Sequence, residues 1–334
     1  MKLPVYAHPT MTVLVDDSDT FLHSLVFQLD PMQASVCFHD PLQALEWFKA
    51  NAGSSELPLQ VDFDNPNQSA EQRNVAVDLE RIYRISGQRQ RFSIPSVLVV
   101  DYSMPQMNGV AFCQAIQHLP CKKILFTGQA DEKIAVDAFN RGLIDRYIKK
   151  SADDALDRLE EEVAALQKAF FQEQSETLLD MLVLHEFSFL RCGALAQVVQ
   201  QLYQEHGFVE HYPFPSPSGI LFFKADGSAQ LMVVETERGY ESQVEMARDS
   251  GAPCSLVQAL EEKRMLPFFP PDGMYSDEVG QHWHRYCKPP QVCRGLETYY
   301  WALFEIEPAL LDIAPTPYAE FLRQHTPPLA AFSF

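Results

Sequence analysis

The first half of the chain alternates short apolar runs with amphipathic stretches, and this alternation constrains its fold more than any other feature. The runs Thr12–Val15 and Ser96–Val100 are continuous and rich in β-branched residues, as in strands buried on both faces. The stretch Asp19–Leu29 repeats apolar residues three and four positions apart, which indicates a helix. Strands that alternate with helices are typical of parallel sheets covered on both faces. The sequence therefore predicts a doubly wound α/β domain with a five-stranded parallel sheet.

The pattern places each element of this first domain. The predicted strands are Thr12–Val15, Ala34–Phe38, Ser96–Val100, Lys123–Phe126 and Arg146–Ile148, and the predicted helices are Asp19–Leu29, Pro41–Ala50, Val110–His118, Asp131–Arg141 and Asp153–Phe171. The last helix begins with a cluster of acids, which suits the positive end of the helix dipole. We expect it to close a domain over residues 1–171 and to serve, over 152–171, as a rigid linker.

One segment, residues 51–94, is too long for this alternation, because typical elements and loops need far less chain between the second and third strands. It contains a helix signal that begins at a capping box, Ser69 and Gln72, and ends at Gly87. The predicted inserted helix has one apolar face, formed by Val75, Leu79, Ile82 and Tyr83. That face either packs on its own domain or contacts a partner, and the partner we expect is a second copy in a homodimer.

Residues 172–334 have a different pattern, which predicts a second domain of the α+β class. The predicted helices are Ala194–Tyr203, Glu241–Arg248 and Ser255–Arg264, and the predicted strands are Gly219–Phe223, Ala229–Val234 and Glu297–Ile306. A polar cluster, His282, His284, Cys287 and Cys293, offers zinc-ligand residue types, but its spacing matches no structural zinc site. The cluster is therefore either a metal site or ordinary loop and core, and we see no enzyme motif in this half.

Charge limits the partners that this protein can bind. The chain has 45 Asp+Glu against 26 Lys+Arg, a net charge of −19, and residues 172–334 hold 22 acids and 10 bases, a net charge of −12. Such a charge disfavours binding to nucleic acid and to anionic membranes.

No stretch reaches the ~18 apolar residues of a membrane helix, and the 7 cysteines show no disulfide spacing. We expect a cytoplasmic protein whose partner is a protein rather than DNA.

Three carboxylates follow predicted strands. Asp16 and Asp17 follow the first strand, and Asp101 follows the third. Because the carboxyl ends of parallel strands meet in one crevice, where ligands bind, we expect these side chains to lie together. Carboxylates held together repel each other unless a cation lies among them, and Mg²⁺ is the hard cation that prefers oxygen ligands. The sequence therefore predicts a magnesium site.

Two further polar groups end the neighbouring strands. Thr127 follows the fourth predicted strand, and Lys149 and Lys150 follow the fifth. A hydroxyl, an ammonium and a metal around one nucleophilic carboxylate form a site for phosphoryl transfer.

In this order and context, the motifs resemble those of the response-regulator receiver domains of two-component signalling. The resemblance covers about residues 11–166, with 51–94 as an insertion, and it implies a flavodoxin-like fold. It also implies that Asp101 accepts a phosphoryl group from a sensor histidine kinase or a phosphotransfer protein. Mg²⁺ would be ligated by Asp17, Asp101 and the Ser103 carbonyl, with Asp16 acting through water or at longer range.

The resemblance implies roles for three more residues. Thr127 would bind a phosphoryl oxygen, Lys150 would pair with Asp101 or its phosphate, and Tyr147 would reorient together with Thr127. Ser151 stands where the family usually has proline, which leaves the choice between Lys149 and Lys150 open. The output domain would bind a protein, and an atypical DNA-binding output and an enzymatic output are the alternatives.

Overall fold

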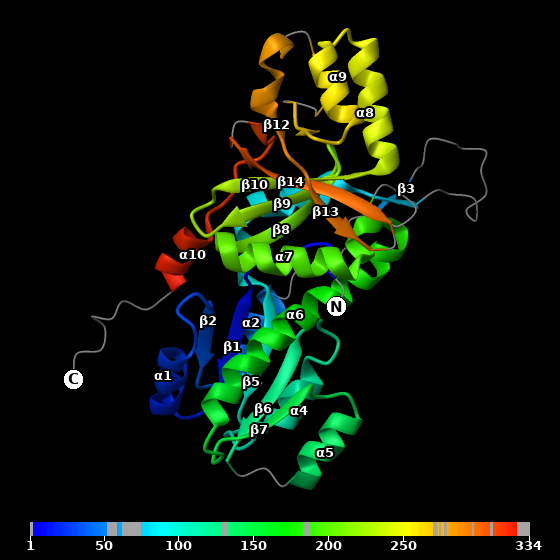
Figure 1. Ribbon diagram of the computed structural model, residues 1–334. Coiled ribbons are helices and arrows are strands. Elements are labelled where there is room, and N and C mark those ends of the chain that lie inside the picture. The colour runs from blue at the N-terminus through cyan, green and yellow to red at the C-terminus, as the bar shows by residue number, and fades with distance from the viewer. Residues whose placement is uncertain are drawn as a thin grey trace. The chain divides into compact units, whose positions relative to one another are not determined.

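The structure is a computed structural model that describes residues 3–51, 59–61, 75–128, 132–182, 187–269, 273, 275–276, 279–295, 297–307 and 310–325 (Figure 1). The chain divides into two compact units. Unit 1 comprises Met1–Ala7, Leu57–Gln88 and Gln174–Pro317, and unit 2 comprises His8–Glu56, Arg89–Glu173 and Tyr318–Phe334. Among the described residues, no helix is both long enough and apolar enough to span a membrane.

Unit 2 contains the predicted five-stranded parallel sheet, in the order β2-β1-β5-β6-β7 (Figure 1). Its strands are β1 (Met11–Val15), β2 (Ser35–Phe38), β5 (Pro95–Val100), β6 (Lys122–Thr127) and β7 (Arg146–Lys149). Its helices are α1 (Asp19–Gln28), α2 (Pro41–Asn51), α4 (Gly109–Ala115), α5 (Glu132–Asn140) and the first part of α6 (Ala155–Leu182). The strand order reverses between β1 and β5, which creates the crevice where such sheets bind ligands. The flavodoxin-like fold is thus confirmed.

The apolar runs of the sequence form these strands because they can be buried on both sides. All five residues of β1 and all six of β5 are buried. One face of the sheet packs on α1 and α6, whose Leu22, Leu25 and Leu159 enter the same core. Helix α1 begins where predicted because the Ser18 hydroxyl accepts a hydrogen bond from the Phe21 amide.

Unit 1 contains a five-stranded antiparallel sheet in the order β13-β14-β10-β9-β8. Its strands are β8 (Phe208–Phe214), β9 (Gly219–Lys224), β10 (Ala229–Thr236), β13 (Gln291–Arg294) and β14 (Thr298–Ile306), and its larger helices are α7 (Gly193–His206), α8 (Glu237–Asp249) and α9 (Cys254–Glu261). The short strands β11 (Leu266–Pro267) and β12 (Cys287–Lys288) form a separate pair. The sequence missed β8 and β13 because neither shows a clear alternation of apolar and polar residues.

The inserted segment differs from its prediction. The capping box at Ser69 and Gln72 lies outside the described residues. The described part forms β3 (Leu59–Val61), β4 (Val75–Val77) and a short helix, α3 (Leu79–Tyr83), so Val75 lies in a strand. Helix α3 begins one residue after Asp78, whose carboxylate accepts a hydrogen bond from the Arg81 amide.

The predicted partner face is wrong for Ile82 and Tyr83. Ile82 is 0% exposed and Tyr83 is 5% exposed, and both belong to the core of unit 1, against which Leu79 also packs. Their apolar surface is covered by this chain itself, so it is not available to a second copy. Residues 57–88 therefore contribute to unit 1, although the sequence assigned them to a domain over 1–171.

The two ends of the described chain each belong to the unit that is more distant in sequence: the N-terminal residues to unit 1 and the C-terminal helix to unit 2. Leu3 and Val5 are buried in the core of unit 1. Helix α10 (Tyr318–His325) belongs to unit 2, where the Tyr318 hydroxyl accepts a hydrogen bond from Ala34 N at 3.1 Å and donates one to Met32 O at 2.7 Å. Helix α6 continues past the predicted end of the linker helix, and unit 1 contains its final part from Gln174.

Candidate functional site

The strand pairing of unit 2 brings two of the predicted carboxylates together. β1 pairs in parallel with β5, and Val15 lies opposite Val100 in this register. Asp16 and Asp101 are the next residues of the two strands, and the Asp101 amide donates a hydrogen bond to Val15 O at 2.9 Å. Both side chains are buried: the exposed fraction is 5% for Asp16 and 7% for Asp101.

Lys150 lies between these two carboxylates. Its Nζ is 2.5 Å from Asp16 Oδ2 and 2.8 Å from Asp101 Oδ1, and it also lies 4.2 Å from the centre of the Phe21 ring. Lys149 is exposed. The structure therefore brings Lys150, and not Lys149, to the two acids, although Ser151 follows it.

Burial and charge act in opposite directions on Asp16. Its pKa is raised, chiefly because burial disfavours the charged form, and the nearby charge of Asp101 adds to this effect. Lys150 and the amide of Ser18, which donates to Asp16 Oδ1 at 2.9 Å, act to lower the same pKa. The ionised form of Asp16 is thus less favourable in the folded protein than in water, as is common where carboxylates are held together for function.

The loop after Asp101 has a geometry that its sequence explains. The Ser103 amide donates a hydrogen bond to Asp101 Oδ2 at 2.8 Å, which fixes the carboxylate. Gly109 lies so close to Asp101 that a Cβ atom would be 2.2 Å from the Asp101 carbonyl oxygen. Asn108 caps α4 by accepting a hydrogen bond from the Ala111 amide at 2.8 Å. The Asn-Gly pair thus lets the helix begin directly against the site.

The remaining predicted residues lie around the same edge of the sheet. Thr127 ends β6, is fully buried, and accepts a backbone hydrogen bond at its carbonyl from the Lys150 amide at 3.0 Å. Tyr147 is half-buried on β7, where it pairs with Leu125. Asp17 and Ser103 are exposed. Phe21 was identified from the sequence only as part of an apolar helix face, because contact with Lys150 requires the folded sheet.

The donor set fits Mg²⁺. In the described part of the chain, no group of three His, Cys, Asp or Glu side chains is arranged to hold a metal. Mg²⁺, however, keeps several waters and is usually held by one or two carboxylates. Asp16 and Asp101 supply hard oxygen atoms that converge on one cation, the Lys150 ammonium. Asp17 directly follows Asp16 in the chain, and Ser103 is two residues after Asp101.

The second predicted cluster does not form a site. His282 and His284 are exposed, whereas Cys287 and Cys293 are buried, and burial raises the pKa of Cys287 to about 12. Cys287 packs in an apolar cluster with Leu256 and Phe269. Among the described residues, His, Cys, Asp and Glu side chains form no group of three that could hold a metal here, so the structure favours the interpretation as ordinary core and loop.

Comparisons with known proteins agree with this geometry. The family model of the response regulator receiver domain matches residues 71–163, which include Asp101, Thr127 and Lys150 but not Asp16 or Asp17. The solved structure of the response regulator LqsR of Legionella pneumophila is similar over 97% of this chain and 97% of its own, with 30% sequence identity and a TM-score of 0.79.

Two shorter structures are similar to about half of this chain. One is the signal receiver domain of an HD domain-containing protein from Pseudomonas fluorescens Pf-5, with 20% identity, 51% of this chain and 95% of that chain covered, and a TM-score of 0.35. The other is an uncharacterized protein from Neptuniibacter caesariensis, with 23% identity, 51% and 96% covered, and a TM-score of 0.34. A search of curated proteins gave no match.

Proposed function

Because this chain belongs to the response-regulator family, we propose that it accepts a phosphoryl group on Asp101 in a Mg²⁺-dependent reaction and transmits the resulting change to its output unit. The observation that carries this proposal is the position of Lys150, whose Nζ contacts both Asp16 and Asp101 where the strand order reverses. A half-buried ammonium beside two buried carboxylates is suited to balance the charge of an incoming phosphoryl group.

In the proposed reaction, a carboxylate oxygen of Asp101 attacks the phosphorus of a phosphohistidine on a sensor kinase or phosphotransfer protein. The bond from phosphorus to the histidine nitrogen breaks, and an acyl phosphate forms on Asp101. Lys150 neutralises part of the added charge, and the Ser103 amide holds the acceptor carboxylate in place. Bound Mg²⁺, held by Asp17, Asp101 and the Ser103 carbonyl with Asp16 nearby, would stabilise charge on the transferring oxygens.

The proposed switch uses Thr127 and Tyr147. Thr127 is fully buried at the end of β6, and Tyr147 is half-buried on the neighbouring strand β7. A hydroxyl that turns toward a new phosphate leaves space that the aromatic ring can fill, which shifts a two-state equilibrium.

For the output, we propose a protein partner in the cytoplasm. The support is the charge of −12 in residues 172–334, with 22 acids against 10 bases, since a DNA-binding surface needs a concentration of positive charge.

We also propose that the protein forms a homodimer. Because Ile82 and Tyr83 are part of the core of unit 1, the dimer would form through a different surface from the predicted one.

Labelling with a small phosphodonor tests the phosphoacceptor. We expect the full chain to gain one acid-stable, base-labile phosphoryl group from acetyl phosphate in the presence of Mg²⁺, and to lose this label with Asp101→Asn or with a chelator. Asp137→Asn, which changes an exposed aspartate of α5, is the matched control and should label normally. Equal labelling of wild type and Asp101→Asn, or no labelling of either, would contradict the proposal.

A further inference from the structure

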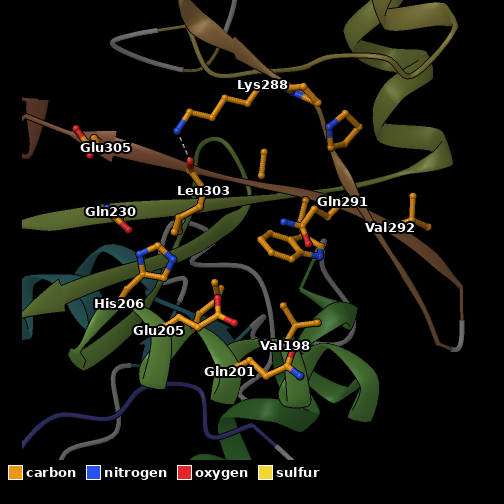
Figure 2. Close-up of a pocket in the computed structure, with 15 residues that line it drawn as sticks. Val198, Gln201, Glu205, His206, Gln230, Lys288, Gln291, Val292, Leu303 and Glu305 are labelled. Carbon is orange, nitrogen blue, oxygen red and sulfur yellow. Dashed lines mark hydrogen bonds between the residues drawn. The ribbon is translucent and has the colours of Figure 1, made fainter.

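A pocket of about 740 Å³ opens on one face of the antiparallel sheet of unit 1 (Figure 2). Its lining comes from α7, from β10 and β14, and from the segment that runs from β12 into β13. All of these residues lie between Val198 and Glu305, so the pocket belongs to unit 1 alone. Its volume lies in the range of small-molecule sites, ~300–1,000 Å³, and about half of its lining residues are apolar.

The floor of the pocket is polar at one end and aromatic at the other. Glu305, Leu303 and Trp301 alternate along β14 and therefore point to the same face of the sheet. Glu305 lies opposite Gln230 of β10, and Trp301 lies opposite Gln291 of β13. The distance from residue 301 to residue 305 is about 13 Å, at ~3.3 Å per residue.

The helix wall of the pocket also contains both polar and apolar residues. Val198, Leu202 and Glu205 are four and three positions apart on α7, so they share one face of that helix. Figure 2 shows His206 on the same side as Gln230 and Glu305, Glu205 between His206 and Val198, and Gln291 and Val292 on the opposite side from Glu305. Helix α7 also ends at His206, and the carbonyl end of a helix carries partial negative charge.

The one lysine of the lining is engaged within the protein. Lys288 Nζ donates a hydrogen bond to Leu303 O at 2.6 Å, drawn as a dashed line in Figure 2, and lies 5.3 Å from the centre of the Phe304 ring. The two carboxylates, Glu205 and Glu305, thus outnumber the single ammonium at this pocket. A ligand that carries positive charge fits this balance better than an anion does.

Gln230 provides a second, independent indication that a hydrogen-bond donor binds in this pocket. Its Oε1 is buried and has no hydrogen-bond partner among the described residues. Such an acceptor lowers the stability of the fold while it lacks a donor. Gln230 lies opposite Glu305 in the strand pairing and lines the polar end of the pocket.

We propose that this pocket binds a small amphipathic amine. The ammonium group lies at the polar end, where the side-chain oxygens of Glu305 and Gln230 accept its N–H bonds. The apolar body, up to about 10 Å long on the strand spacing above, lies along Leu303 toward Trp301 and Val292. The pocket contains no residue of the phosphoryl-transfer site, so an amine would act as a second input on the output unit, beyond the proposed phosphorylation.

Calorimetric titration of the full chain tests the charge preference with three probes of matched size. 4-Phenylbutylamine carries an ammonium group, 4-phenylbutanol is neutral, and 4-phenylbutyrate is an anion. We expect saturable one-to-one binding of the amine, weaker binding of the alcohol and the weakest binding of the acid. No saturable binding of the amine, or tighter binding of the acid, would overturn the proposal.

Two variants test where the amine binds. Glu305→Gln should weaken amine binding about three- to tenfold, as for an exposed ion pair, and leave alcohol binding unchanged, whereas Glu307→Gln, an exposed neighbour outside the pocket, should change neither. Gln230→Met should weaken amine binding while the chain keeps or gains thermal stability, because it removes the unpaired acceptor. Unchanged amine affinity in both Glu305→Gln and Gln230→Met would overturn the proposed site.

Discussion

At the scale of single residues, the proposed phosphoryl-transfer site holds charged groups in an arrangement that opposes the stability of the fold. Asp16 and Asp101 are both buried, and one ammonium, that of Lys150, contacts both of them. The raised pKa of Asp16 shows that burial outweighs the help from Lys150. Functional sites commonly keep such unfavourable charge, and removing it tends to stabilise the fold at the expense of activity.

We therefore expect Asp16→Asn to stabilise the chain near neutral pH, by on the order of 1 kcal/mol, when a chelator removes divalent cations. A carboxyl whose pKa is raised by folding binds its proton more tightly in the folded state, so the wild type gains stability as pH falls through that pKa. The advantage of the variant should accordingly shrink in acid. Urea unfolding at two pH values measures this.

Asp17→Asn is the control for this prediction, because Asp17 is adjacent but exposed. Its unfolding free energy should stay near that of the wild type in chelator. A clear loss of stability in Asp16→Asn at neutral pH would show that the contact with Lys150 outweighs burial.

His211 should make the stability of unit 1 depend on pH in the opposite sense. It is 2% exposed, its Nδ1 accepts a hydrogen bond from the Tyr203 hydroxyl at 2.6 Å, and its Nε2 donates one to Pro4 O at 3.0 Å. Burial lowers its pKa to about 4. The stability that depends on neutral His211 is complete above the ordinary histidine pKa of ~6.5 and decreases as pH falls toward 4.

His211→Gln tests this dependence. Between about pH 7.5 and 5.5, the wild type should lose roughly 1 kcal/mol that His211→Gln does not lose, as measured by urea unfolding. His118→Gln, at an exposed histidine of unit 2, should follow the wild type. Parallel pH curves for wild type and His211→Gln would contradict the assignment.

At the scale of elements, the inserted segment shows how tertiary packing replaces a local signal. The sequence places Val75, Leu79, Ile82 and Tyr83 on one helical face, but the structure forms a strand at Val75–Val77 and a helix of five residues at Leu79–Tyr83. The periodicity of a short apolar stretch is compatible with either a helix or a strand. Which of the two forms depends on the core against which the stretch packs. Here the covering core is that of unit 1.

Substitutions in α3 separate core packing from self-association. Ile82→Ala should lower the unfolding free energy by about 2–4 kcal/mol, and Leu79→Asp should lower it too, while light scattering gives the same mass for both variants and the wild type. Glu80→Gln, on the exposed side of the same helix, is the control. If the variants had a lower mass than the wild type and an unchanged unfolding free energy, this face would instead be a self-association surface.

At the scale of the whole molecule, the chain passes back and forth between its two units. Each unit is assembled from three segments that are distant in sequence, and α6 contributes residues to both. Leu3, Val5 and Ile82 contribute to the core of unit 1, and Tyr318 completes hydrogen bonds in unit 2. Cutting the chain at any single position therefore cannot give two fragments that each contain one whole unit.

We expect a fragment of residues 1–171 to be less stable than the full chain and to bind an apolar dye, because it exposes Leu3, Val5 and Ile82 and lacks α10. A version that begins at His8 and replaces residues 57–88 with a short Gly-Ser linker is the matched comparison, and it should bind less dye. Thermal unfolding and dye fluorescence measure both. Equal stability of the 1–171 fragment and the full chain, with no dye binding, would support the predicted boundary.

The sequence by itself determined the parallel sheet of unit 2 and the residues at its edge. Buried strands must be continuously apolar, and the polar residues that follow them, Asp16, Asp101, Thr127 and Lys150, must then lie at one edge of a parallel sheet. Only the tertiary structure decided that Lys150 contacts both acids, that Ile82 is buried in unit 1, and that Glu305 and Gln230 share a pocket. Local patterns record burial and periodicity, whereas these contacts join residues far apart in sequence whose proximity depends on the packing of the whole chain.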